Sequence, residues 1–286
     1  MKLTEYISFL RDESKNYNYG NYKYPFDPFD LDDQKKEFLE IVENNNAVIT
    51  KHYRQCGMTS LISAIIAYEM IKSILSKKFY NGKIYKIAFI TFNQSACIDM
   101  KNKVVSNLKK TTGLLINDND PNKIELSNKK CKSILYLGSD KNFFTDLEYI
   151  NRLCVDNAAF IKNDYELYSS LKSLLVKKDY KILLSSVPNG HDNLFYDIYR
   201  YSLDSNYGFK IFDFYWFLDK NKNHNLKWAA IKDSNEIYHD NDPSARTALR
   251  MLNLGFYPFN EYTESFINCF YCNDGAITQE IYGNFL

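Results

Sequence analysis

Apolar and polar positions along the chain fall into blocks that predict β-strands and α-helices in turn. Short apolar runs with the length and composition of buried strands occupy residues 47–50, 83–92, 149–160, 180–190 and 209–217. Apolar side chains at helical spacing occupy the stretches between them, at 60–75, 95–110, 164–178 and 192–203. Strands that alternate with helices of this length favour an α/β fold with a largely parallel sheet.

The two ends of the chain and one central segment depart from this alternation. Residues 1–30 end in Tyr-Pro-Phe-Asp-Pro-Phe-Asp, and the prolines predict an extended N-terminal strap. A helix is expected from residue 31 to the Asn run that ends at 46, and a hairpin over 123–139. After residue 217 the pattern loosens. We therefore expect a strap (1–30), a core (31–217) and a small C-terminal subdomain (218–286).

Composition limits the classes of function. Of the 286 residues, 45% are hydrophobic and 25% are charged, which is typical of a globular chain. Lys and Arg number 36 against 35 Asp and Glu, so any contact with nucleic acid must come from a local patch. Cys269 and Cys272 form a CxxC pair without a second pair, which disfavours zinc. Neither a signal-peptide core nor a membrane span is recognisable, so a soluble intracellular protein without a membrane partner is expected.

Candidate chemistry lies at three strand ends, because ligands of open α/β sheets bind where strands end and helices begin. Gly57-Met58-Thr59 matches the end of a phosphate-binding loop, and the Thr59 hydroxyl is placed to hold Mg²⁺. Asp156 ends the strand in 149–160, and Ser186 ends the strand in 180–190. Taken singly, each has a plain structural interpretation as a strand followed by a turn. We expect the strand before the loop and the strand before Asp156 to be neighbours in the sheet.

The order of these features is more specific than any one of them. Gln34 lies in LDDQKKEFL, followed by Arg54-Gln55-Cys56-Gly57-Met58-Thr59, then CVDNAAFI, then SSVPNGHDNLFYDIY. Over roughly residues 31–230 the chain resembles the ATPase domain of the large terminase subunit, the DNA-packaging motor of tailed bacteriophages. The resemblance implies a RecA-like or P-loop-like sheet flanked by helices, with a small C-terminal subdomain.

The resemblance also implies roles for individual residues. Gln34 is expected to recognise adenine, and the loop from Lys51 and His52 through Thr59 to hold the phosphates. Arg54 is expected at the γ-phosphate, and Thr59 with Asp156 at Mg²⁺. The implied coupling residues, which link the nucleotide state to movement, are Ser185, Ser186 and Asn189. The implied nucleotide-binding residues are Gln34, Lys51, His52, Arg54, Gln55, Gly57, Met58 and Thr59, and the implied catalytic residues are Arg54, Asp156 and Asn157.

Two departures from the family pattern bear on catalysis. The phosphate-loop lysine is replaced by Met58 and His52 at its two usual places, which leaves Lys51 as a substitute in a reshaped loop. The glutamate that follows the metal-binding Asp is Asn157, which orients water but cannot accept its proton. Loss of a general base costs about 10²–10⁴ in rate. The alternative interpretation is therefore a catalytically degenerate structural or regulatory protein with weak or no ATP hydrolysis.

The partners implied by the resemblance are ATP, Mg²⁺, double-stranded DNA, the phage portal, the small terminase subunit and further copies in a ring. The implied location is the host cytoplasm. A C-terminal nuclease domain is not expected, because no cluster of carboxylates on a series of strands follows the terminase-like part of the sequence. A third interpretation, a helicase fragment, is weakened by the absence of further Arg-rich helicase motifs.

Overall fold

The computed structural model describes most of the chain. The described residues are 1–16, 29–76, 84–139, 150–162, 167, 169, 171, 180–204, 208–220, 222–230, 237–239, 245–261 and 263. Most of the helix expected at 164–178, and the pair Cys269 and Cys272, lie outside them.

A mixed eight-stranded sheet forms the centre of the fold, in the order β3-β4-β5-β2-β6-β7-β1-β8. Its strands are β1 (Ala47–Lys51), β2 (Ile84–Ile90), β3 (Leu115–Asn117), β4 (Lys123–Ser127), β5 (Lys132–Gly138), β6 (Arg152–Asp156), β7 (Lys181–Ser186) and β8 (Lys210–Asp213). All pairings from β5 to β8 are parallel, and only β3-β4 and β4-β5 are antiparallel. The expected parallel α/β sheet and the hairpin at 123–139 are thus confirmed.

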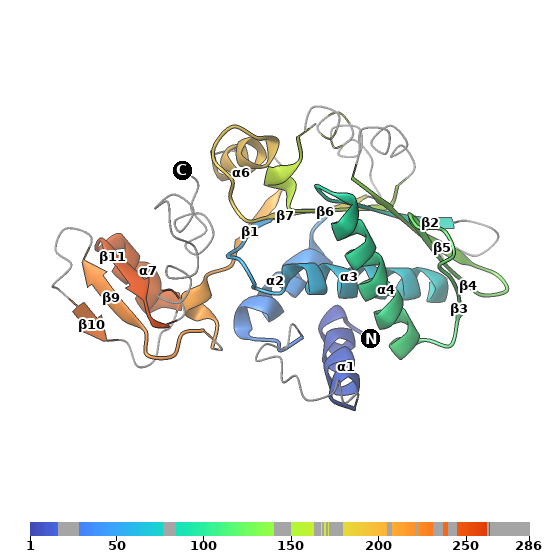
Figure 1. The fold of residues 1–286 in the computed structure, drawn as a ribbon, viewed down its shortest axis with the longest axis horizontal. Helices are drawn as coiled ribbons and strands as arrows, with labels where there is room; N and C mark the ends of the chain where they lie inside the picture. The colour runs from blue at the N-terminus through green and yellow to red at the C-terminus, as the bar shows by residue number, and fades with distance from the viewer. Residues whose placement is uncertain are drawn as a thin grey trace.

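Helices cover both faces of the sheet (Figure 1). One face carries α1 (Leu3–Asn16), α2 (Asp33–Asn44), α3 (Met58–Leu75) and α4 (Gln94–Thr111), and the other carries η3 (Ala158–Phe160) and α6 (Leu194–Asp204). Two separate hydrophobic clusters, one on each face, fill the layers. This three-layer arrangement buries both faces of the parallel strands.

The N-terminal segment corrects the expectation of an extended strap. Residues 3–16 form α1, which contacts α2, α3 and α4. Leu3, Tyr6, Ile7 and Leu10 recur at helical spacing and are all buried. The prolines at 25 and 28 lie beyond α1, so they do not interrupt it.

Helix α3 runs through the middle of the fold and is apolar on nearly all sides. It is long and apolar enough to span a membrane, but 72% of it is buried within the described fold. Helices that are hydrophobic all round belong either to membranes or to the core of a large domain. The burial of α3 is that of a core helix in an α/β domain.

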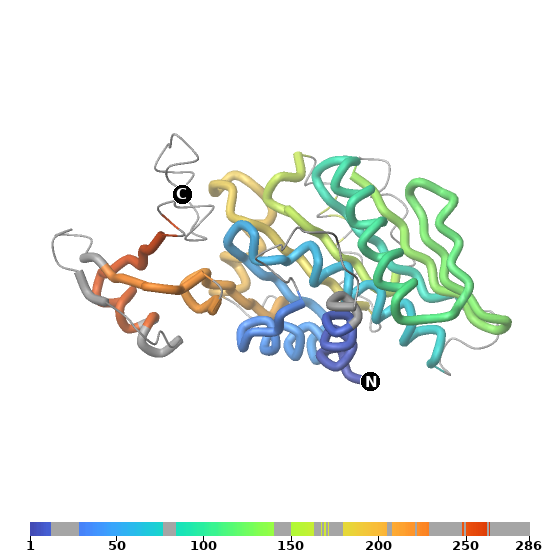
Figure 2. Tube along the Cα trace, turned by 60° about the horizontal axis from the view of Figure 1, so that its bottom comes forward, coloured from blue at the N-terminus to red at the C-terminus, as the bar shows by residue number. Residues whose placement is uncertain are grey.

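Beyond β8 the chain forms η4 (Trp216–Leu218) and a second, three-stranded sheet in the order β10-β9-β11. The elements of this part are β9 (Lys227–Ala230), β10 (Ile237–His239), α7 (Ala245–Asn253) and β11 (Phe256–Phe259). They lie at the β8 end of the central sheet, opposite β3 and β4 (Figure 2). Phe217 and Trp228 pack edge to face and join this part to the larger hydrophobic cluster.

The order of the strands corrects one further expectation. Strand β7 lies between β1 and β6, so the strand before the loop and the strand before Asp156 are not neighbours. The residues described between β6 and β7, among them η3, Leu167 and Leu171, belong to the hydrophobic cluster on the other face of the sheet. The inserted strand brings its own end, with Ser185 and Ser186, to the same edge of the sheet as the loop and Asp156.

Candidate functional site

Three parallel strands end side by side and bring three polar side chains into one row. Ser185 of β7 is in register with Thr50 of β1 on one side and with Asp156 of β6 on the other. All three residues are buried. Since carboxyl ends of parallel strands meet at one edge, the loops that follow β1, β6 and β7 share one site.

The loop from 52 to 57 makes a tight turn between β1 and α3. Gln55 has φ 61° and Gly57 has φ 84°, both in the left-handed region. Glycine adopts this conformation readily, whereas a glutamine there is uncommon. The side chains of Asp32 and Asn93 cap α2 and α4, but Gly57 gives α3 no such cap. The first amides of α3 are therefore without a side-chain cap at the mouth of the loop.

Thr59 and Asp156 meet directly across this site. The Thr59 hydroxyl donates a hydrogen bond of 2.8 Å to Oδ2 of Asp156. Burial raises the pKa of Asp156, and the nearby His52 and the hydrogen bond from Thr59 oppose that rise. Ser185 Oγ lies 3.5 Å from Oδ1 of the same carboxylate. The two residues expected at Mg²⁺, which lie far apart in the sequence, are thus brought into contact.

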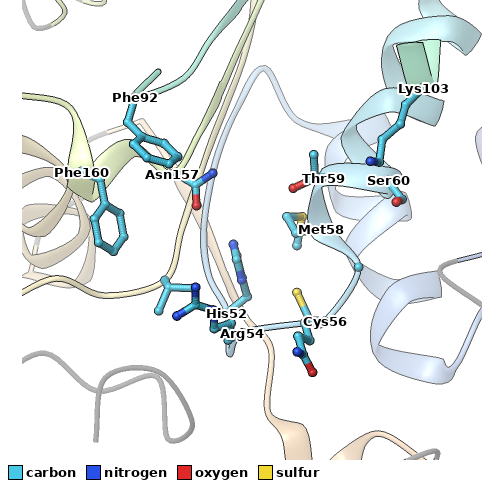
Figure 3. A pocket seen from close by; sticks show the side chains of 13 residues that line it. His52, Arg54, Cys56, Met58, Thr59, Ser60, Phe92, Lys103, Asn157 and Phe160 are labelled. Carbon is cyan, nitrogen blue, oxygen red and sulfur yellow. The ribbon is translucent and has the colours of Figure 1, made fainter. Parts of the chain in front are cut away.

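A cavity of about 530 Å³ opens over the loop. Its lining includes residues 52 and 54–60, Phe92, Lys103, Asn157, Phe160 and Val187. Figure 3 shows Phe92, Phe160 and Asn157 on one side and the first turn of α3 with Lys103 on the other. The volume falls in the range of pockets that hold a cofactor or a nucleotide.

The cations near the loop are arranged differently from the expectation. Lys51 does not line the cavity; its ammonium lies 3.6 Å from Oδ2 of Asp213 and over the ring of Tyr199. Met58 lines the cavity but contributes no charge. Arg54 lines the cavity and is exposed. Lys103 of α4, which the sequence did not single out, lines it as well.

His52 is a buried member of the site. It is 6% exposed, and its Nδ1 lies 3.1 Å from the carbonyl oxygen of Tyr53. Burial by itself lowers the pKa of His52, but the interaction with the Cys56 sulfur and the charge of Asp156 outweigh it and raise the pKa to about 9. The imidazole is therefore positively charged at neutral pH. The sequence around His52 gives no sign of this environment, because Asp156 is more than a hundred residues away in the chain.

Asn157 follows Asp156 in a left-handed conformation, with φ 56°. Asparagine is one of the few residues that adopt it at low cost. The backbone amide of Asn157 donates to Oδ1 of Asp156 at 3.0 Å, and its side chain lines the cavity. The position expected to face a reacting water thus does face the cavity.

The end of β7 is tied to the segment after β6. The Ser186 hydroxyl accepts a hydrogen bond from the amide of Ala159 at 3.1 Å, and Asn189 Nδ2 donates to the carbonyl of Ala159 at 3.1 Å. The chain after Asp156 is therefore hydrogen-bonded directly to the Ser185–Asn189 segment. These are the residues expected to couple the site to movement.

Gln34 is engaged elsewhere. Its Nε2 donates to the carbonyl of Tyr215 at 3.0 Å, and its Oε1 accepts from the amide of Tyr215 at 2.9 Å. Gln34 does not line the cavity. In this structure the amide holds α2 against the chain after β8, and recognition of adenine by Gln34 stays a prediction.

Sequence reasoning missed three groups at the site. Lys103 is one, the aromatic pair Phe92 and Phe160 is the second, with ring centroids 6.1 Å apart, and Lys222 is the third. The Lys222 ammonium donates to the carbonyl of Gln55 at 2.7 Å. Lys103 and Lys222 resemble ordinary surface lysines in the sequence, so no local signal identified them.

Comparison with known proteins supports the fold. No family model matches the chain, and no characterised protein matches it by sequence. Solved structures do match. The large terminase of a thermophilic bacteriophage, in complex with ADP, superposes with a TM-score of 0.54 at 14% identity, over 86% of this chain and 49% of that one. The ATPase domain of the Thermus phage P74-26 large terminase gives 0.56 at 12% identity, over 88% of this chain and 99% of that domain.

The chain has the fold of a phage large-terminase ATPase domain. The large terminase of bacteriophage HK97 matches as well, with a TM-score of 0.54 at 13% identity over 76% of this chain and 44% of that one. The chain thus spans about half the length of the ADP-bound terminase and of the HK97 terminase. The terminase resemblance and the RecA-like architecture expected from the sequence are borne out at the level of fold.

Proposed function

We propose that this chain is a terminase-type ATPase domain that helps to package double-stranded DNA into a phage prohead. One observation carries the proposal: on a terminase-like fold, Thr59 and Asp156 form a 2.8 Å hydrogen bond beside the loop that joins β1 to α3. The large terminase of the thermophilic bacteriophage has been solved with ADP and with ATP-γ-S, which supports a nucleotide as the ligand of the corresponding cavity here.

The residues of the loop suit the binding of a nucleotide phosphate chain. The uncapped amides at the start of α3 are suited to binding an anion, and Arg54 adds a permanent positive charge at the cavity. Thr59 and Asp156 supply two hard oxygen ligands, which fits Mg²⁺ held jointly with phosphate oxygens and water. When bound, the metal neutralises charge that develops on the phosphates.

Turnover is expected to be slow. Asn157 faces the cavity with an amide that orients a water molecule but does not take its proton. The absence of a general base at this position costs about 10²–10⁴ in rate. Whether Asn157 supports any turnover decides between a slow motor domain and a terminase-like protein that does not hydrolyse ATP. The fold comparison favours the packaging function.

Movement is expected to pass through the end of β7. Ser186 and Asn189 hold Ala159, two residues beyond Asn157, so a change at the phosphates reaches the Ser185–Asn189 segment. If that segment also affects DNA binding, the linkage is reciprocal: ATP changes the affinity for DNA by the factor by which DNA changes the affinity for ATP. The proposed partners are duplex DNA, the portal, the small terminase subunit and further copies in a ring, in the host cytoplasm.

Calorimetry with ATP, with and without Mg²⁺, tests nucleotide binding. The wild-type chain is expected to bind ATP, and Mg²⁺ is expected to strengthen binding. Thr59→Val keeps the shape of the side chain and removes the hydroxyl, so it should abolish the effect of Mg²⁺. A wild-type chain that binds no nucleotide at millimolar concentration contradicts the proposal.

Fluorescence anisotropy with a short duplex tests DNA binding, and its dependence on nucleotide, separately. With a net charge of +1, the chain is expected to bind duplex DNA weakly, with a dissociation constant of about 10⁻⁴–10⁻⁶ M and a steep salt dependence. Saturating ATP and Mg²⁺ should shift that constant. DNA binding without any nucleotide effect would leave a structural role in place of the motor.

A further inference from the structure

A lysine on a neighbouring helix reaches the cavity where the loop itself lacks one. Lys103 lies in the middle of α4 and lines the cavity with residues 54–60. Figure 3 shows its side chain descending from α4 toward the first turn of α3, beside Ser60 and Thr59. Among the described lining residues it is the sole lysine.

The other candidates for a compensating lysine charge are committed elsewhere. Lys51 pairs with Asp213, both side chains being 15% exposed, and it stacks over Tyr199. Lys222 is held by Gln55, Asp219 and the Tyr53 ring. Arg54 remains at the cavity, but a nucleoside triphosphate carries several negative charges, and terminase-like loops are expected to supply a lysine beside the arginine.

The position of Lys103 is fixed by packing between the two helices. Asn107, one turn after Lys103, donates a buried hydrogen bond of 3.1 Å to the Ser63 hydroxyl. Ser63 is one turn after Ser60 on α3, so this bond sets Lys103 opposite Ser60. Val104 and Leu108 of α4 are buried in the same layer as α3. The lysine is therefore presented by a rigid element and not by a loop.

We propose that Lys103 supplies the phosphate-binding ammonium that Met58 does not, and that it contacts the phosphate chain over the first turn of α3. The inference rests on the proposed nucleotide site and assigns to it one further binding residue. The ligand it selects is a polyphosphate, because an ammonium group recognises charge and not the base. The positive charge that a loop lysine would supply to the cavity thus comes from the adjacent helix α4.

Substitution of Lys103 tests the inference. Lys103→Met keeps helix propensity and length and removes the charge, and Lys103→Arg keeps the charge. Lys109→Met is the matched control, since Lys109 is on the same helix, is exposed and does not line the cavity. Calorimetry with ADP, ATP and inorganic pyrophosphate, each with Mg²⁺, should show dissociation constants about 10- to 100-fold higher for Lys103→Met. Lys103→Arg and Lys109→Met should stay within about threefold of wild type.

A second measurement uses the wild-type chain and so does not depend on the folding of a variant. Lysine acetylation is followed by mass spectrometry with and without pyrophosphate and Mg²⁺; Lys103 should be protected and Lys109 should not. Equal affinity of wild type and a folded Lys103→Met, or equal acetylation of Lys103 with and without pyrophosphate, overturns the inference but leaves nucleotide binding standing. A wild type that binds none of the three ligands overturns the proposed site and the role of Lys103 with it.

Discussion

The Lys222 ammonium donates a 2.7 Å hydrogen bond to the main-chain carbonyl of Gln55, and so joins the chain after the central sheet to the candidate phosphate loop. Gln55 is the residue of that loop with φ 61°. Tyr53, also in the loop, donates to Asp219 Oδ2 at 2.7 Å, and the Lys222 ammonium lies 4.3 Å from the Tyr53 ring centroid. Contacts from Asp219 and Lys222 thus stabilise the unusual backbone of the loop.

Lys222→Met is expected to loosen this attachment. The carbonyl of Gln55 loses its donor and the fully buried Asp219 loses a cation at 3.8 Å, so the free energy of unfolding should fall by about 1–3 kcal/mol. Nucleotide affinity should fall as well, since the loop is no longer pre-ordered. Chemical denaturation and calorimetry measure the two effects. The control is Lys220→Met, an exposed lysine two residues earlier, and equal stability of the two variants contradicts the role of Lys222.

Asn157→Glu is expected to restore a general base. Hydrolysis should rise about tenfold or more over Asn157→Gln, the uncharged variant of equal length. Both substitutions place a longer side chain at φ 56°, so any cost of the left-handed backbone, about 1 kcal/mol, is common to them. Steady-state phosphate release is the measurement.

Adding Met58→Lys to Asn157→Glu separates the effect of the missing loop lysine from the effect of the missing general base. If Lys103 supplies the ammonium, the second substitution should change the rate less than about threefold, because an ammonium at this point of the cavity is already present. A much larger gain shows that the missing loop lysine limits turnover. That outcome also argues against the role assigned to Lys103.

The charge of His52 predicts how stability changes with pH. The pKa of His52 rises from 6.5 to about 9 on folding, through the net effect of Cys56 and Asp156 against burial. A group that binds its proton more tightly in the folded state stabilises the fold fully below pH 6.5 and loses that contribution as the pH rises toward 9. Between pH 6 and pH 8.5 we expect wild type to lose about 2 kcal/mol more unfolding free energy than His52→Asn.

The comparison with His52→Asn is needed because Lys222 has the opposite dependence. Burial lowers the pKa of Lys222 to about 8, so this lysine loses its proton more readily in the folded state than in the unfolded state. Its effect on the free energy of unfolding therefore becomes more favourable as the pH rises above about 8. Denaturation curves for both chains across the range isolate the histidine. A direct check is the NMR titration of His52, which should remain protonated at pH 7.5; a neutral ring at that pH contradicts the prediction.

Arg152 and Glu69 form a buried ion pair whose disruption should be costly. Arg152 Nη2 lies 3.1 Å from Glu69 Oε1, and the Arg152 side chain is 2% exposed. Glu69→Gln removes the charge that compensates this guanidinium and should cost about 3–5 kcal/mol in chemical denaturation. Replacing both, as Glu69→Leu with Arg152→Met, should recover most of the loss. Lys36→Gln, which breaks an exposed pair with Asp33, should cost less than about 1 kcal/mol.

Much of the fold was determined by local pattern. Apart from β3 and η3, the strands and helices that the structure describes between residues 31 and 213 were predicted, because apolar spacing and turn residues report on neighbours within a few positions. The strands at 149–160 and 209–217 proved shorter, Arg152–Asp156 and Lys210–Asp213, since apolar residues continue past the hydrogen-bonded pairing. The helical spacing of Leu3, Tyr6, Ile7 and Leu10 was also present, but the later prolines obscured it.

The order of the motifs also predicted that the loop before Thr59, Asp156 and Ser186 belong to one site, because the loop follows a strand and the other two residues end strands. Only the tertiary structure decided how they meet. It inserted β7 between β1 and β6, set Thr59 against Asp156, turned Lys51 away toward Asp213, and brought Lys103 to the cavity. Strand order and helix crossing depend on packing between segments that lie more than a hundred residues apart, as β1 and β7 do. A single side chain such as Lys103 carries no mark of that packing in the sequence around it.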